Sequence, residues 1–271
     1  GSGNLTLGIP GCPGIPEAVA ADTLTLPYND SEALEKLFQQ RGHEIAAVIT
    51  EPVVGNMNCI PPDIDFLKNL ERLCKTHESL LVFDEVMTGF RVHLQGAQTL
   101  YGIHPDLTTL GKVIGGGLPV GALGGRREIM DHLAPIGPVY QAGTLSGNPI
   151  AMAVGLKTLE LISVPGFYDQ LFDYTSRLCT GLDNIAQSLG VPLITQHVGS
   201  MFGIFFTSLE KVKSFDDVQH CDIAAFNRFF HKMLEQGVYL GPSAYEAGFV
   251  SIAHNDETLE LTLAAARRAL S

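Results

Sequence analysis

The stretches LLVFDEVMTGFR (residues 80–91) and LTTLGKVIGGGLPVGALGGR (residues 107–126) decide the fold of this chain. Each begins with a short apolar run, which indicates a buried strand. The first run ends at Asp84 and the second leads to Lys112. Because the carboxyl ends of parallel strands open onto a common crevice, we expect the Asp84 and Lys112 side chains to face it together.

Three further segments predict the rest of a sheet and its helices. Segment 31–42 (SEALEKLFQQRG) has a serine to cap a helix and a glycine to end it, and segment 44–52 (EIAAVITEP) is typical of a buried strand. Segment 61–79 has apolar side chains at helical spacing on one face, namely Phe66, Leu67, Leu70, Leu73 and Cys74. This alternation predicts an α/β domain whose mostly parallel sheet is flanked by helices.

The chain changes character after residue 166, where a smaller α+β domain is predicted. The expected elements there are helices over 167–189 and 222–236, strands within 192–206 and a terminal helix from Asn255. We therefore expect three parts, which are a loop over 1–16, part of a large domain over 17–160 and a small domain over 161–271.

Composition narrows the choice of partners and compartment. A net charge of −12 over 271 residues argues against nucleic acid and against an acidic membrane surface as partners. The five cysteines and nine histidines are scattered without metal-ligand spacing, so we expect no metal site. Free thiols of this kind are typical of a cytoplasmic protein, and Cys74 fits a packing role on its helix.

The chain opens with a Gly/Pro-rich loop, GSGNLTLGIPGCPGIPE (residues 1–17), which has neither an initiator Met nor a signal-peptide pattern. An enzyme that begins inside a loop is implausible. We therefore expect a fragment that lacks its amino-terminal portion.

Asp84 and Lys112 together suit one cofactor. Pyridoxal phosphate needs an anion to keep its ring nitrogen protonated and an amine to form a Schiff base with its aldehyde. Each residue also has a plainer interpretation, because an Asp at a strand end often caps a turn and a single Lys at a turn is usually a surface residue. Glu85 would point the other way from the strand and is interpreted as structural.

Three other residues are candidates for contacts with that cofactor. Thr144 precedes a helix predicted from residue 149, where a hydroxyl, backbone amides and the helix dipole could bind phosphate; the alternative is an ordinary turn before an Asn cap. Asn56 follows a predicted strand and could bind the ring oxygen or only shape a turn. Val86, two residues beyond Asp84, could press against the ring or belong to the core.

Five motifs together produce a specific resemblance. They are EPVVGNM (51–57), DEVMTGFR (84–91), LGKVIGGG (110–117), GPVYQAGTLSGNP (137–149) and SAYEAGFVS (243–251). Through them the chain resembles the class III pyridoxal-phosphate aminotransferases, and most closely the glutamate-1-semialdehyde 2,1-aminomutases. The resemblance implies the fold type I aminotransferase architecture.

The resemblance also implies roles for the candidate residues. Lys112 would carry the cofactor and transfer protons. Asp84 would pair with the ring nitrogen, and Val86 would pack against the ring. Asn56 would approach the ring oxygen, and Glu246, in the last motif, would face the substrate and the lysine.

The same resemblance implies a second subunit and a lid. Thr144 would bind the phosphate of a cofactor held mainly by the other subunit, so a homodimer with shared active sites is implied. The opening loop would be the mobile lid, with Ser2 near the substrate carboxylate. The family's main phosphate-binding loop, ring-stacking aromatic and carboxylate-binding arginine would precede this lid. Either they form a separate or cleaved piece that complements this chain, or the chain is catalytically incompetent.

The implied reaction moves an amino group within one small molecule. (S)-4-amino-5-oxopentanoate would become 5-aminolevulinate, the tetrapyrrole (porphyrin) precursor, by way of a diamino intermediate, while the cofactor passes between its pyridoxal and pyridoxamine phosphate forms. Two alternatives stay open. One is a class III ω-aminotransferase that uses a separate keto acid, and the other is an inactive fragment that only dimerises.

Overall fold

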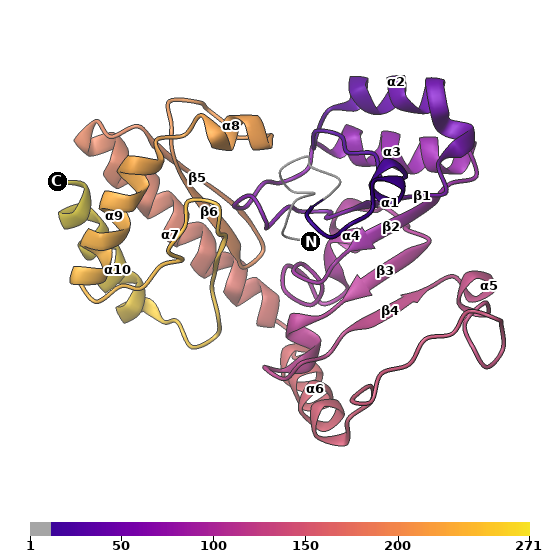
Figure 1. Ribbon diagram of the computed structural model, residues 1–271. Coiled ribbons are helices and arrows are strands. Elements are labelled where there is room, and N and C mark those ends of the chain that lie inside the picture. The colour runs from indigo at the N-terminus through magenta and orange to yellow at the C-terminus, as the bar shows by residue number, and fades with distance from the viewer. Residues whose placement is uncertain (1–11) are drawn as a thin grey trace. The chain divides into compact units, whose positions relative to one another are not determined.

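The structure of residues 12–271 is a computed structural model, and it divides into two compact units (Figure 1). Of the described residues, unit 1 comprises those up to Asp30, Val53–Asp63 and Gly166–Ser271, and unit 2 comprises Ser31–Pro52 and Ile64–Pro165. The domain boundary drawn from the sequence at 160/161 stays a prediction. The units add Val53–Asp63, which carries Asn56, to the carboxyl-terminal part of the chain.

Unit 2 is built on a four-stranded sheet. The strands lie in the order β1 (Ala47–Thr50), β2 (Leu80–Asp84), β3 (Leu107–Leu110) and β4 (Ala122–Gly125). The first three run parallel, and β4 pairs antiparallel with β3. The predicted α/β class with a mostly parallel sheet is therefore confirmed.

Helices lie against this sheet as the apolar spacing predicts. The elements of unit 2 are α2 (Ser31–Arg41), the 3-10 turn η1 (Gly42–Glu44), α3 (Ile64–Thr76), α4 (Gly96–Tyr101), the 3-10 turn η2 (Lys112–Gly115), α5 (Arg127–Met130) and α6 (Pro149–Ile162). Figure 1 shows α2 and α3 on the same side of the sheet. The five apolar residues predicted for one face of α3 are all buried.

One expectation about the sheet is wrong. The segment around Ile49 was expected to be a buried strand, but the Ile49 side chain is 61% exposed. Among the described residues β1 pairs with β2 alone, so it is an edge strand, and fewer neighbouring side chains cover its faces there.

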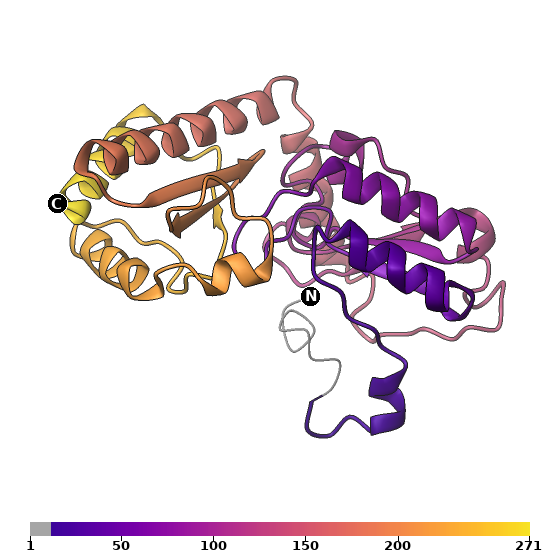
Figure 2. The same cartoon turned by 90° about the horizontal axis from the view of Figure 1, so that it is seen from above.

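Unit 1 contains an antiparallel sheet and its covering helices. Its elements are α1 (Glu17–Ala21), α7 (Phe167–Leu189), β5 (Leu193–Val198), β6 (Met201–Phe206), α8 (Phe215–Gln219), α9 (Ile223–Glu235), β7 (Gly248–Phe249) and α10 (Asp256–Leu270). The central strand β6 pairs with β5 and β7. Figure 2 shows α7 extending alongside β5 and β6.

Both faces of β6 are covered, because all six of its residues are buried. Alternate residues Phe202, Ile204 and Phe206 join a core with α7, α9 and α10. Phe205, which points to the other face, packs against a second cluster that includes Val54, Met57 and Ile60. Residues 53–63 therefore form a second layer on this sheet, opposite the helices.

Among residues 12–271, no single helix is both long and apolar enough to cross a bilayer. Only α6 and α7 taken together, despite the bend between them, meet the length and composition test.

His197 in β5 is a partly buried histidine from which we expect a pH-dependent stability of unit 1. Its Nδ1 atom is buried and has no hydrogen-bond partner among the described residues, and its ring lies 5.6 Å from that of Phe172. Burial lowers the pKa of His197, and the nearby Asp183 carboxylate opposes this shift. Burial likewise raises the pKa of Asp183, against hydrogen bonds from Thr195.

We expect the free energy of unfolding to fall as the pH drops through about 6.5, where His197 is protonated more readily in the unfolded chain. The raised pKa of Asp183 has the opposite sign and adds stability only as that carboxyl is protonated at more acidic pH. His197→Phe should flatten the decline measured by urea unfolding at a series of pH values. His43→Asn, at an exposed histidine, should leave the decline unchanged; an equal flattening there would contradict the assignment.

Candidate functional site

The carboxyl ends of β2 and β3 bring the first two predicted residues to one edge of the sheet. Asp84 is the last residue of β2 and lies opposite Thr109 of the parallel strand β3. Lys112 follows the end of β3 at Leu110 after one intervening residue, Gly111. The two side chains thus leave neighbouring parallel strands at the same end, as the sequence predicts.

The Asp84 carboxylate is held by two donors. Its Oδ1 atom accepts hydrogen bonds from the Val86 backbone N–H (3.1 Å) and from the Thr109 hydroxyl (3.3 Å). The side chain is half-buried. A carboxylate fixed in this way can pair with a cationic nitrogen without first losing rotamer freedom. Thr109 was not singled out from the sequence; its position opposite Asp84 follows only from the strand register.

Lys112 begins η2 in a left-handed backbone conformation with φ of 47°. This region is unfavourable for residues with a Cβ atom, and such strain occurs preferentially at functional positions. Gly111 lies directly against Val86, because a Cβ atom built on Gly111 would be 3.2 Å from Val86 Cγ1. Val86, Gly111 and Lys112 therefore belong to one local arrangement beside Asp84.

Glu85 points away from this edge, as strand alternation predicts. It is fully buried, and its carboxylate accepts hydrogen bonds from the Thr88 hydroxyl (2.9 Å), the Ala97 N–H (2.6 Å) and both the backbone and side-chain amides of Gln98 (each 3.1 Å). A side chain on Gly96 would collide with this carboxylate. Glu85 thus anchors the start of α4, and its neighbour Asp84 remains the candidate for chemistry.

Thr144 lies in an exposed turn, residues 144–147, before α6. Its role in phosphate binding stays a prediction. The Asn148 side chain accepts hydrogen bonds from the Ile150 and Ala151 N–H groups, and the Asn148 carbonyl accepts one from Met152. Because these amides are already used, Thr144 could contribute its own hydroxyl to a phosphate but not the α6 amides.

The remaining candidates lie elsewhere in the chain. Asn56 and Glu246 belong to unit 1, whereas Asp84 and Lys112 belong to unit 2. Asn56 is half-buried and Glu246 is exposed on the loop before β7. Ser2 lies outside the described residues, so its role stays a prediction.

Three of the five cysteines are buried packing residues and not candidate nucleophiles. Burial raises the pKa of the Cys59, Cys74 and Cys179 thiols to about 12, so these side chains stay protonated and act as apolar packing groups. Within residues 12–271 there is also no group of three His, Cys, Asp or Glu side chains that could hold a metal ion.

Comparison with known proteins agrees with this arrangement. The aminotransferase class-III family profile matches residues 5–254, which is most of the chain. The chain belongs to the class III aminotransferase family. The predicted fold type I architecture is confirmed by this match and by the solved structures that the chain resembles.

Three of those structures illustrate the range of activities. An omega-transaminase from Sphaerobacter thermophilus is 29% identical with a TM-score of 0.86, and the match covers 96% of this chain and 59% of the transaminase chain. A beta-phenylalanine aminotransferase from Variovorax paradoxus is 33% identical with a TM-score of 0.82, covering 90% and 56%. A glutamate-1-semialdehyde-aminomutase from Pseudomonas aeruginosa PAO1 in complex with PMP is 24% identical with a TM-score of 0.82, covering 95% and 58%. This chain therefore spans less than two thirds of each of these proteins.

Proposed function

We propose that this protein uses pyridoxal phosphate and that Asp84, Val86 and Lys112 form part of its binding site. The observation that supports this most is the position of Asp84 and Lys112 at the same end of adjacent parallel strands. The residues present fit the cofactor, because they supply a carboxylate and an amine, and the absence of a side chain at Gly111 lets the backbone before Lys112 lie close to Val86. The solved aminomutase was obtained in complex with PMP, which is consistent with this proposal.

Asp84, Lys112 and Val86 would each have a different role toward the bound cofactor. When bound, the cofactor supplies an aldehyde that couples to amines and a protonated ring that accepts electrons from the substrate. Asp84, oriented by Thr109, would hold a proton on the ring nitrogen by charge attraction. Lys112 would bind the cofactor and move protons at the reacting carbon, and Val86 would restrain one face of the ring.

We further propose that the reaction is the conversion of (S)-4-amino-5-oxopentanoate to 5-aminolevulinate. Substrate and product contain the same atoms, since an amino group and an oxygen function exchange places, and no external amino acceptor is consumed. The lid-like opening sequence and the SAYEAGFVS motif support this reaction over a general transamination. Glu246 and Asn56, from two of those motifs, would contact substrate and ring oxygen.

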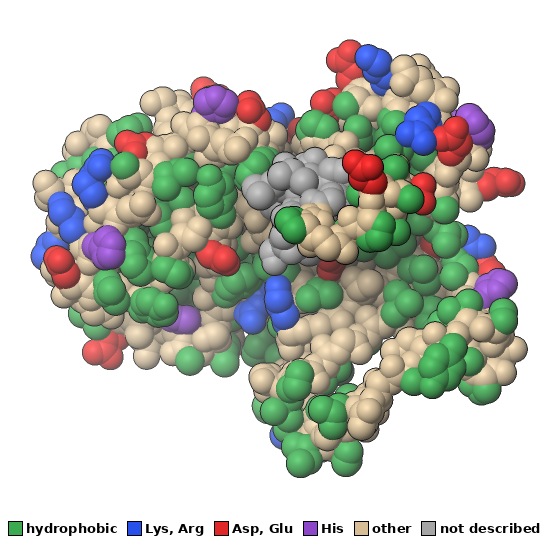
Figure 3. Space-filling view, in the orientation of Figure 1, with side chains coloured by type: hydrophobic (Ala, Val, Ile, Leu, Met, Phe, Trp, Pro, Cys, Tyr) green, Lys and Arg blue, Asp and Glu red, His purple; other side chains and the backbone are tan. Residues whose placement is uncertain are grey.

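A homodimer is also proposed. Large apolar side chains are exposed on α6 and on the segment that leads into it, among them Tyr140 (83% exposed), Leu145 (73%), Ile150 (68%) and Leu156 (62%). Figure 3 shows hydrophobic side chains gathered over this part of unit 2. A second copy covering this surface would also bring Thr144 next to the partner's cofactor.

The decisive test is product formation without an amino acceptor. We expect the full-length protein, loaded with pyridoxamine phosphate and given the semialdehyde alone, to form 5-aminolevulinate over many turnovers. A single turnover per site, or turnover that requires an added keto acid or aldehyde, would contradict the aminomutase assignment. Product is measured by derivatisation and mass spectrometry.

A class III ω-aminotransferase is the second candidate. It is favoured by the higher identity to the omega-transaminase (29%) and to the beta-phenylalanine aminotransferase (33%) than to the aminomutase (24%). This candidate predicts consumption of an amine donor in proportion to a second amino acceptor. The same assay, run with and without that acceptor, separates the two reactions.

A further inference from the structure

Asn58 is a buried polar residue in the layer that covers the second face of the β5–β7 sheet. It is 1% exposed, and it has a left-handed backbone with φ of 70°. Asparagine tolerates this conformation better than most residues with a Cβ atom. It lies two residues beyond Asn56, with which it forms a short β-bridge.

Every polar group of the Asn58 side chain is used. The Nδ2 amide donates to the carbonyl oxygens of Ala244 (2.9 Å) and Ile204 (3.1 Å), and Oδ1 accepts from the Cys59 N–H (2.8 Å). The Asn58 backbone N–H donates to the carbonyl oxygen of Tyr245 (2.6 Å). One residue thus connects the turn that follows Asn56, strand β6, and the loop before β7.

The loop bound by Asn58 is the one that carries Glu246. Asn58 donates hydrogen bonds to the carbonyl oxygens of Ala244 and Tyr245, the two residues immediately before Glu246. Ala244 and Ala247 are buried on either side of the exposed Glu246. Inside the loop, the Glu246 N–H donates to the Ser243 carbonyl (3.0 Å). The loop is therefore fixed from its buried side, and the Glu246 carboxylate is left facing out.

The neighbouring strand makes room for this contact. Gly203 of β6 lies against Asn58, and a Cβ atom on Gly203 would overlap Asn58 Oδ1. No side chain at position 203 therefore competes with the amide. Gly203 thus leaves room for the Asn58 side chain, and the carbonyls of Ile204 and Ala244 accept its hydrogen bonds.

We infer that Asn58 is a positioning residue that holds the Glu246 loop in register with the Asn56 turn. This inference rests on the proposed function, in which Asn56 contacts the cofactor and Glu246 the substrate. The two groups come from segments more than 180 residues apart in sequence, and the Asn58 amide is a direct link between those segments. Without it, two buried carbonyls lose their donors and the loop can shift independently of Asn56.

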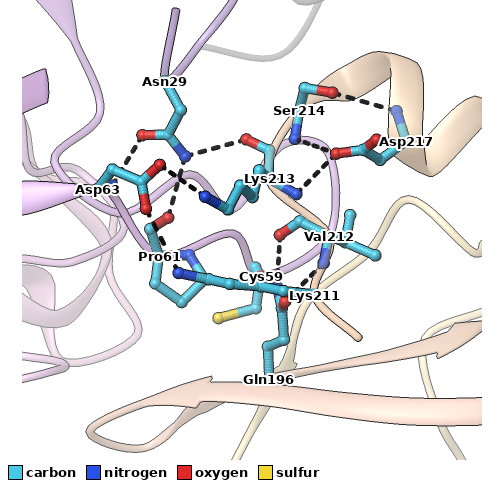
Figure 4. Close-up of polar contacts among 10 residues, drawn as sticks. All are labelled: Asn29, Cys59, Pro61, Asp63, Gln196, Lys211, Val212, Lys213, Ser214 and Asp217. Carbon is cyan, nitrogen blue, oxygen red and sulfur yellow. Dashed lines mark hydrogen bonds and ion pairs between the residues drawn. The ribbon is translucent and has the colours of Figure 1, made fainter. Parts of the chain in front are cut away.

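Gln196 supplies a matched control. Its side chain also makes three hydrogen bonds in the same layer, to the Cys59 carbonyl (3.3 Å) and to both the N–H (2.8 Å) and the carbonyl (3.0 Å) of Val212 (Figure 4). These bonds secure the segment that continues to Lys213, whose ammonium pairs with Asp63 (Figure 4). They do not involve residues 243–247.

The first test is hydrogen exchange of the loop peptide that covers residues 243–247. Asn58→Gly removes the amide and accepts the left-handed backbone; Asn58→Asp keeps the volume and the acceptor for Cys59 but replaces the donors. We expect exchange in this peptide to be at least about tenfold faster in both variants, and unchanged in Gln196→Ala at matched global stability. If this peptide exchanges at the same rate in both Asn58 variants as in Gln196→Ala, the inference is wrong. If one Asn58 variant does not fold, the other is enough for this comparison.

The second test is steady-state kinetics of the cofactor-loaded protein. We expect kcat to fall about tenfold or more in the Asn58 variants beyond any change in Gln196→Ala, because Glu246 would no longer be held in place. A loosened loop with full kcat would refute the positioning role. If the unaltered protein turns over neither the semialdehyde nor an amine with an acceptor, the proposed function fails, while the exchange result still decides whether Asn58 holds the loop.

Discussion

Lys112→Ala is expected to lose covalent attachment of pyridoxal phosphate and nearly all turnover. The structure places this lysine in a strained backbone conformation beside Gly111, at the end of the strand next to Asp84. Loss of a side chain that transfers protons alone lowers kcat by about 10²–10⁴-fold, and loss of the amine that binds the cofactor adds to this. Attachment is measured by borohydride reduction followed by intact mass, and turnover by the product assay.

Lys75→Ala is the matched control for this experiment. Lys75 is an exposed lysine on α3 in the same unit, where it pairs with Glu71 at 3.0 Å. Its replacement should leave both attachment and turnover at the level of the unaltered protein. If Lys112→Ala still gains the mass of the cofactor on another lysine, the assignment of Lys112 is wrong. If the unaltered protein takes up no cofactor at all, the inactive-fragment alternative is supported.

Glu85→Ala is expected to cause the largest loss of stability. Four donors in the start of α4 and the preceding turn point at this buried carboxylate, and each buried donor that loses its partner costs about 1–3 kcal/mol. We therefore expect the free energy of unfolding to fall by at least about 3 kcal/mol, measured from the urea midpoint and slope. A loss below about 1 kcal/mol would show that water replaces the carboxylate without penalty.

The adjacent residue provides the contrast. Asp84→Asn keeps the side-chain volume and the oxygen that accepts from Val86 and Thr109. It should change the free energy of unfolding by less than about 1 kcal/mol while removing the charge that favours a protonated ring nitrogen. The expected pattern is retained cofactor with most turnover lost. Unchanged turnover in Asp84→Asn would refute the ring-nitrogen role, whatever Glu85→Ala does.

The sequence was sufficient where side chains repeat with a regular period. The apolar spacing over 64–76 predicted α3 and its buried face, and the short apolar runs before Asp84 and Lys112 predicted two parallel strands. The opposite directions of Asp84 and Glu85 followed from strand alternation. Motifs then sufficed for the family, since the class III assignment drawn from them is confirmed.

Other features were decided by tertiary structure alone. The exposure of Ile49 depends on the edge position of β1, and the occupied amides of α6 depend on the rotamer of Asn148. Thr109 supports Asp84 only because β2 and β3 align in one register. Asn58 has no periodic signal in the sequence, yet its amide binds carbonyls 146 and 186 positions away. Sequence periodicity predicts which residues of one helix or strand share a face. Hydrogen-bond partners this distant in sequence are determined by how whole elements pack together.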